Sequence, residues 1–120
     1  MGAIKSFTDL NAWRASHKLV LAVYKLTDAF TEKEKYSLTD QIRRASVSIT
    51  SNIAEGFGRQ TYKDKIKFYY QANGSIFEVK NQLIIARDLG YIKLDAELLI
   101  LCNSAHKLLH GLISTSKKRI

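Results

Sequence analysis

The segment SLTDQIRRASVSITSNIAEG, from Ser37 to Gly56, decides the fold of this 120-residue chain. Its apolar residues recur at spacings of three and four, which places them on one face of a helix. These residues are Leu38, Ile42, Ala45, Ile49 and Ile53. Because the hydroxyl of Ser37 is followed three residues later by the acid Asp40, as in a capping box, we expect the helix to begin there.

Three further segments of the chain show the same periodicity. We therefore predict four helices, over about residues 8–29, 38–57, 62–89 and 95–115, followed by a basic tail over residues 116–120. A second capping pattern, Thr61 to Asp64, is expected to begin the third helix. Gly90 can adopt the left-handed backbone conformation that ends it. Asp95 is expected to cap the fourth helix.

The composition and the short connections predict an all-α fold. Proline, the usual residue of loops and linkers, is absent. Helices of about 20 residues are about 30 Å long, so short turns make successive helices run in opposite directions. The chain is expected to be one domain, residues 1–120, folded as an antiparallel up-down-up-down four-helix bundle. Because glycine costs about 1 kcal/mol inside a helix, Gly74 is expected to mark a close approach by another helix.

Targeting signals and cysteine content indicate a cytoplasmic protein. No apolar stretch has the length of a signal peptide or of a membrane span. Cys102 is the only cysteine, which excludes an internal disulfide, and its apolar surroundings predict a buried thiol. Gly2 fits the N-myristoylation pattern, but whether this glycine is native or a cloning scar stays open.

Several motifs carry a family resemblance over nearly the whole chain. They are Phe7-Thr8-Asp9-Leu10 with Trp13, Gln41-Ile42-Arg43-Arg44-Ala45, Asn52-Ile53-Ala54-Glu55-Gly56, Ala72-Asn73-Gly74-Ser75 and Leu89-Gly90-Tyr91-Ile92. They resemble the four-helix bundle family also called S23 ribosomal protein, whose founding members are encoded by intervening sequences in bacterial 23S rRNA genes. One departure is Thr31, where the family commonly has proline.

The resemblance implies a bacterial homopentamer without known enzymatic activity. A related branch, the accessory variability proteins of retroelements, is similar and works as a basic pentamer with a reverse transcriptase and nucleic acid. Whether this chain also works with a reverse transcriptase and nucleic acid, or has any role in the ribosome, stays open.

A polar stripe on the second helix has two interpretations. Its members follow one another at spacings of three and four, and they are Gln41, Arg44, Ser48, Asn52, Glu55 and Arg59. The first interpretation is a subunit interface formed by Gln41, Arg44, Ser48, Asn52 and Glu55, in which side-chain hydrogen bonds set the register. The second is a solvated helix side with local pairs, Arg44 with Ser48 and Glu55 with Arg59. The spacing does not separate them, and the resemblance favours the interface.

The formal net charge of +8 is expected to lie at one end of the bundle. Antiparallel topology gathers twelve lysines and arginines, Lys80 among them, against four acids, Glu78 among them, into the half that holds both chain termini. The residues expected to contact nucleic acid are Arg59, Lys63, Lys65, Lys67, Lys117, Lys118 and Arg119. Tyr62, Tyr69 and Tyr70 lie among these cations and suit the stacking of bases. The alternative is a solvated turn, packed tyrosines and a solubilising tail.

Patterns typical of catalysis and metal binding are weak in this sequence. Glu55 has only Glu78 as a candidate partner for acid–base chemistry. His106 and His110 lie one turn apart, but no third ligand suggests itself, and Ser48 lacks the histidine and acid of a nucleophilic triad. We therefore expect no enzyme, no metal site and no cofactor.

Two functions stay open from the sequence. The first is a homo-oligomeric bundle that binds RNA or DNA non-specifically through its basic end, as an accessory or scaffold factor. The second is a structural adaptor that holds another protein and does not bind nucleic acid.

Overall fold

The computed structural model describes residues 3–93 and 96–120, and in these residues it is all α, with no strand. The four long helices are α1 (Asn11–Thr27), α3 (Asp40–Phe57), α4 (Tyr62–Asp88) and α5 (Ala96–Lys117). Three short elements accompany them: the 3-10 turn η1 (Phe7–Asp9), α2 (Glu32–Glu34) and the π-helical turn η2 (Lys35–Thr39). The predicted all-α fold with four helices is thus confirmed.

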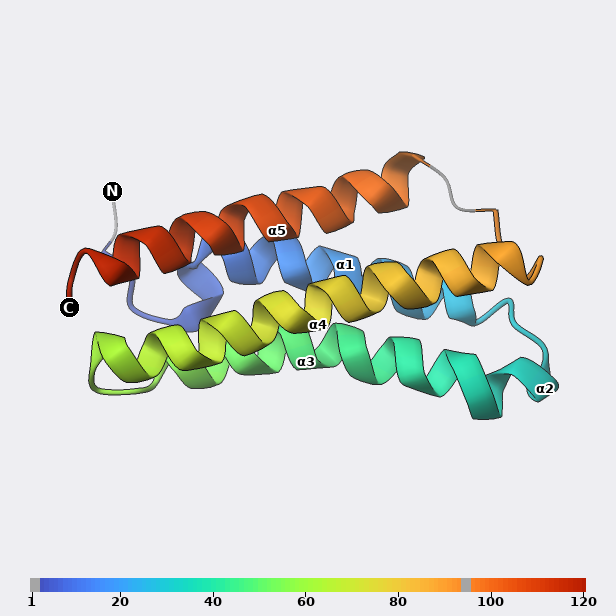
Figure 1. Cartoon of the computed structure of the whole chain (residues 1–120), viewed down its shortest axis with the longest axis horizontal. Helices are drawn as coiled ribbons and strands as arrows, with labels where there is room; N and C mark the ends of the chain where they lie inside the picture. The colour runs from blue at the N-terminus through green and yellow to red at the C-terminus, as the bar shows by residue number, and fades with distance from the viewer. Residues whose placement is uncertain (1–2, 94–95) are drawn as a thin grey trace.

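The four long helices lie alongside one another, and the molecule extends 45 × 25 × 19 Å (Figure 1). α1 and α4 each pack against both α3 and α5, and the contact between α3 and α4 is the most extensive. Figure 1 shows η1, the turn between α3 and α4, and the C-terminus of α5 at the same end. We call this end the terminal end.

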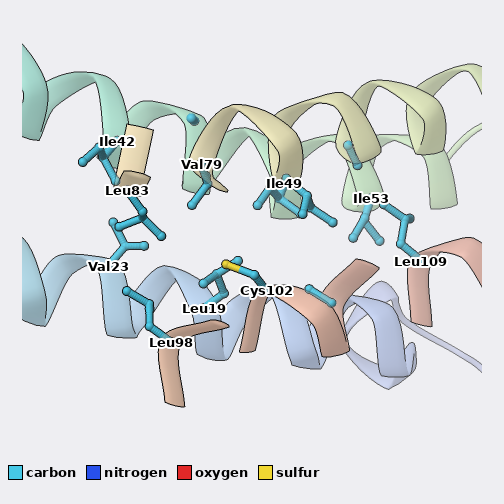
Figure 2. Packing of buried hydrophobic residues seen from close by; sticks show 14 of the residues in the cluster. Leu19, Val23, Ile42, Ile49, Ile53, Val79, Leu83, Leu98, Cys102 and Leu109 are labelled. Carbon is cyan, nitrogen blue, oxygen red and sulfur yellow. The ribbon is translucent and has the colours of Figure 1, made fainter. Parts of the chain in front are cut away.

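The core forms where apolar faces of all four long helices meet, as Figure 2 shows. The labelled residues are Leu19, Val23, Ile42, Ile49, Ile53, Val79, Leu83, Leu98, Cys102 and Leu109, and all of them are buried. The predicted inward face of the second helix is confirmed, from Leu38 in η2 to Ile53 in α3. Cys102 is the buried thiol that its surroundings predict, and burial raises its pKa.

Tyr24 of α1 lies outside the core, in contact with α3. Tyr24 is 39% exposed, and the guanidinium of Arg43 on α3 lies 4.6 Å from the centroid of its ring. Arg43 also donates to the hydroxyl of Thr27 and pairs with Asp28, both at 2.8 Å. Tyr24 therefore belongs to a polar contact between α1 and α3, not to the core.

Two of the predicted helix ends are confirmed. The hydroxyl of Thr61 accepts the backbone N–H of Asp64 at 3.2 Å and caps α4. At the other end, Gly90 has a φ of 81°, and the N–H of Tyr91 donates to the carbonyl of Ala86 at 2.9 Å. This closes α4 with a left-handed cap, a conformation that favours glycine.

The predicted start of the second helix is wrong. The chain is already helical from Glu32, and η2 carries it through Ser37 into α3. Because the helix continues upstream, the Ser37–Asp40 pattern does not mark a helix terminus. The first helix also begins later than expected: Ser6 and Asp9 form a capping box around η1, and α1 starts only at Asn11. Asp95 and Gly2 lie outside the described residues.

The close helix approach predicted at Gly74 is found at Gly56 instead. Gly74 is exposed, and apart from its chain neighbours and the backbone of its own helix, no heavy atom of the described residues lies within 4 Å of where its Cβ would be. Gly56 is buried, and a Cβ there would lie 2.7 Å from Cε1 of Tyr69 and 2.9 Å from Cβ of Phe68. The end of α3 can therefore approach the first turns of α4 only because residue 56 has no side chain.

Candidate nucleic-acid interface

Positive charge gathers at the terminal end of the molecule. This end contains the first half of α1, the end of α3, the first half of α4 and the second half of α5 (Figure 1). Its cationic residues are Lys5, Arg14, Lys18, Arg59, Lys63, Lys65, Lys67, Lys107, Lys117, Lys118 and Arg119, and its acidic residues are Asp9, Glu55 and Asp64. These eleven cations and three acids give a formal excess of +8.

Lys80 and Glu78 do not belong to this end, contrary to the expectation. Both follow Ser75, the middle residue of α4, and the ammonium of Lys80 donates to Asn103 in the first half of α5 at 3.3 Å. Because one cation and one acid leave the group together, the charge excess is unchanged.

The structure brings the tail of α5 to the first turns of α4. The guanidinium of Arg119 lies 5.8 Å from the ring centroid of Tyr62, and the ammonium of Lys117 lies 5.1 Å from that of Tyr70. Both distances are within the range of cation–π attraction. Lys118 between them is exposed. These contacts join predicted binding residues that are more than 45 positions apart in the sequence.

Arg59, in the turn between α3 and α4, has an aromatic partner. Its guanidinium lies 4.5 Å from the ring centroid of the half-buried Phe68. Arg59 is itself exposed, so it presents charge to solvent while its planar group covers the ring. The sequence spacing suggested a pair between Glu55 and Arg59, but in the structure the guanidinium of Arg59 lies over Phe68 instead.

Lys65 has a structural partner inside the chain. Its ammonium donates to the backbone carbonyl of Phe57, the last residue of α3, and lies 5.3 Å from the Phe57 ring centroid. Partial burial lowers the pKa of Lys65. A cation that satisfies a terminal helix carbonyl stabilises that terminus. Lys65 therefore links α4 to the end of α3, and its ammonium is less available to a phosphate than the ammonium of an exposed lysine.

Lys63 and Lys67 are the exposed lysines of the first α4 turns. Lys67 lies 3.8 Å from the carboxylate of Asp64, with both side chains more than half exposed. An exposed pair of this kind contributes little to stability and is easily exchanged for another anion. Lys63 and Lys67 are therefore available for phosphate contacts.

The predicted subunit-interface residues follow the border between α3 and α4 of the same chain. The hydroxyl of Ser75 on α4 donates to the hydroxyl of Ser48 at 2.9 Å, and the amide of Asn52 donates to Ser48 at 3.1 Å. Arg44 pairs with Asp40 at 2.9 Å and not with Ser48. Gln41, Arg44 and Glu55 are exposed, whereas Ser48 and Asn52 are half-buried. The role of these residues in a subunit interface stays a prediction.

One feature of this region was missed by the sequence analysis. The Nδ1–H of His106 on α5 donates to the amide oxygen of Asn73 on α4 at 2.9 Å, and the His106 ring lies 5.4 Å from that of Phe77 in an edge-to-face arrangement. Tyr70 and Phe77 lie seven residues apart in the sequence, and this spacing could have indicated that the two aromatic side chains share one side of α4.

Among the described residues no group of three histidine, cysteine, aspartate or glutamate side chains is placed to hold a metal ion.

These observations define a class: an all-α protein with four long helices and a strongly basic end. The family model described as "23S rRNA-intervening sequence protein" matches residues 8–111, which span nearly all of the chain. The chain therefore belongs to this family. No protein with a curated description matches it. In the described part of the chain, no helix has the length and apolar character that a membrane span requires.

Proposed function

We propose that this protein is a non-enzymatic, homo-oligomeric bundle that binds RNA or DNA non-specifically through its terminal end, as an accessory or scaffold factor. The single observation that carries the proposal is the excess of +8 at that end, to which the N-terminal segment, α1, the turn between α3 and α4, α4, and α5 with its tail all contribute cations. Polyanions bind such surfaces with the release of counterions, without any need for base-specific contacts.

The proposal includes an antiparallel up-down-up-down topology. It is supported by the position of the turn between α3 and α4 beside η1 and the end of α5, and by the packing of each long helix against two neighbours. This topology makes the terminal end a single surface. Without it, the same lysines and arginines would be spread along the molecule.

The proposed oligomer is a homopentamer, by its family resemblance, in the cytoplasm of a bacterium. The exposed Gln41, Arg44 and Glu55 are the residues that we propose for subunit contacts. If five terminal ends point the same way, they form a ring of roughly +40, which would attract nucleic acid strongly at low salt.

The test is a salt titration of binding. Fluorescence anisotropy of a labelled RNA of mixed sequence, from about 50 to about 200 mM salt, should show affinity that falls steeply with salt. A variant with Lys63→Gln and Lys67→Gln should bind more weakly, and its slope should be reduced by about 0.7 for each phosphate that the variant no longer neutralises. Lys65 is left intact in this variant because it supports the end of α3.

The matched control removes two exposed lysines from the opposite end of the molecule. Lys25→Gln with Lys93→Gln changes the net charge by the same amount but lies outside the terminal end. We expect this control to keep the wild-type slope. Absence of binding at about 50 mM salt, or equal weakening in both variants, would overturn the proposal.

One observation favours a second candidate, a protein adaptor. The side of the molecule between α1 and α5 has two hollows of about 400 Å³ and 450 Å³, and Leu101 lines both. Leu21 and Ile100 on these helices are among the most exposed apolar residues, at 58% and 64%. If the adaptor function holds, the Ile100→Ser variant should no longer capture the protein partner that the wild type captures from native extract.

A further inference from the structure

We propose that the α4–α5 border carries a track for single-stranded nucleic acid, so that the protein prefers single strands to duplexes. The track consists of the α4 residues Tyr62, Tyr70 and Phe77, together with the side chains of α5 that contact them. This inference rests on the nucleic-acid binding proposed above and adds to it the form of nucleic acid that is bound.

The three aromatic side chains are large and open to solvent. Tyr62 is 37% exposed, Tyr70 is 47% exposed and Phe77 is 53% exposed. Seven residues are close to two helical turns and eight residues exceed two turns by about 80°, so the three side chains share one side of α4. At 1.5 Å per residue the row is about 22 Å long. A strand with the 3.4 Å rise per nucleotide that it has in duplex DNA would cover this row with about seven nucleotides, and a more extended single strand would cover it with fewer.

Each ring of the track has a cationic or imidazole side chain beside it. Arg119 lies over Tyr62, Lys117 over Tyr70, and both Lys80 and His106 lie next to Phe77, with distances of 5.8, 5.1, 5.9 and 5.4 Å to the ring centroids. His106 lies in the middle of α5, Lys117 is its last residue, and Arg119 follows it in the tail. The two helices therefore contribute different groups: α4 supplies the rings and α5 supplies most of the cations.

This alternation fits a single strand better than a duplex. In a single strand, the bases are accessible and stack on aromatic side chains, while the phosphates lie within reach of adjacent cations. In a duplex, the base faces are already stacked on one another, so only the phosphates, the sugars and the base edges in the grooves are available. Exposed aromatic rings with cations beside them therefore add affinity for a single strand but not for a duplex.

A matched cation–aromatic pair lies outside the track. Tyr24 of α1 is 39% exposed, and its ring lies 4.6 Å from the Arg43 guanidinium, as close as any pair in the track. Arg43 also forms an ion pair with Asp28 at 2.8 Å, so its charge is compensated. The Tyr24 pair has the same chemistry without the surrounding positive charge, which makes it an internal control.

The experiment compares one labelled oligonucleotide of about 12 nucleotides as a single strand and as a duplex, by fluorescence anisotropy at about 50 mM salt. The wild type should bind the single strand more tightly. Tyr70→Leu should weaken single-strand binding by at least about five-fold, the lower end of what stacking on one ring provides, and leave duplex binding unchanged. Tyr70→Phe keeps the ring and should bind as the wild type does, and Tyr24→Leu should change neither affinity.

A second measurement identifies the residues in contact. After ultraviolet irradiation, a single strand that contains 5-iodouracil should become crosslinked to Tyr62, Tyr70 or Phe77 and not to Tyr24.

Equal affinity for single strand and duplex, together with no effect of Tyr70→Leu, would overturn the track but leave the basic end intact as a binding surface. Failure of the wild type to bind either form would instead overturn the proposed function. If Tyr70→Leu changes the number of subunits and not the affinity, the row is a contact between protein copies and the track is rejected.

Discussion

Gly56 and Tyr69 approach each other so closely across the contact between α3 and α4 that a Cβ on Gly56 would lie 2.7 Å from Cε1 of Tyr69. Tyr69 is buried, and Phe68 presents its Cβ at 2.9 Å, so neither neighbour can move away by a simple rotation. Gly56→Ala should lower the free energy of unfolding by about 1 to 3 kcal/mol, the usual cost of overpacking. Urea denaturation followed by circular dichroism measures the change.

Gly74→Ala is the matched control for this prediction. Gly74 also lies inside a long helix, but its Cβ would point into open space among the described residues. Because alanine favours the helix over glycine, this variant should gain about 1 kcal/mol. Similar effects of the two substitutions would show that the close approach at Gly56 is not a constraint.

The hydrogen bond between Ser48 and Ser75 is expected to couple α3 to α4. Each single alanine variant should lose about 1 kcal/mol of unfolding free energy, and the double variant should lose less than the sum. The coupling energy of the double-mutant cycle, measured in urea, should be about 0.5 to 1 kcal/mol. A coupling energy near zero would mean that the two hydroxyls act independently.

Arg44 offers a test of the predicted subunit interface. Its pair with Asp40 is exposed, with 80% of the Arg44 side chain accessible, so the pair contributes little to the stability of one chain. If the polar stripe meets another subunit, Arg44→Glu should shift the oligomer toward monomer without a large change in unfolding free energy. Light scattering coupled to size-exclusion chromatography measures the mass.

Arg87→Glu is the control for the interface test. Arg87 is an exposed arginine at the end of α4 and pairs with the adjacent Asp88 at 3.0 Å, much as Arg44 pairs with Asp40. This substitution lies outside the polar stripe and should leave the mass unchanged. An unchanged mass for Arg44→Glu as well would remove the stripe from the interface.

Tyr69 makes stability depend on pH in the alkaline range. Burial, and to a smaller extent the nearby Tyr62, raises the pKa of Tyr69 from 10.0 to about 12. Between these values the unfolded chain loses the phenolic proton while the folded chain keeps it. The unfolded state then binds fewer protons, and the free energy of unfolding falls as pH rises.

The comparison with Tyr69→Phe isolates this effect, because phenylalanine has no proton to lose. From pH 9 to about pH 11, the wild type should lose about 1.4 kcal/mol more than the variant, the equivalent of one pKa unit. Urea unfolding at each pH measures both proteins. Parallel pH profiles would show that the Tyr69 phenol ionises equally well in the folded and unfolded states.

The helix faces could be predicted because periodicity is a local property of the sequence. The row from Leu38 to Ile53 at spacings of three and four suffices to place these side chains in the core. The start of that helix could not be placed by the same reasoning. Ser37 and Asp40 form a capping pattern, but a pattern marks a helix end only where the residues before it leave the helix, and here η2 continues it.

The residues that meet in space were harder to predict than the helices. Gly74 and Gly56 have similar helical surroundings in the sequence, and only the packing of α3 on α4 distinguishes them. The gathering of charge at the terminal end could be predicted from the expected topology. The contact of Lys65 with the carbonyl of Phe57 could not. Nor could the contacts of Arg119 and Lys117 with the tyrosines of α4, because they depend on where α5 ends.

The uneven distribution of charge along a body 45 Å long gives each molecule a large permanent electric dipole moment. A polyanion would exert a torque on such a molecule before the two touch, and would turn the positive end forward. Productive encounters would then be a larger share of all collisions, and added salt would slow association by shortening the distance over which this orientation begins.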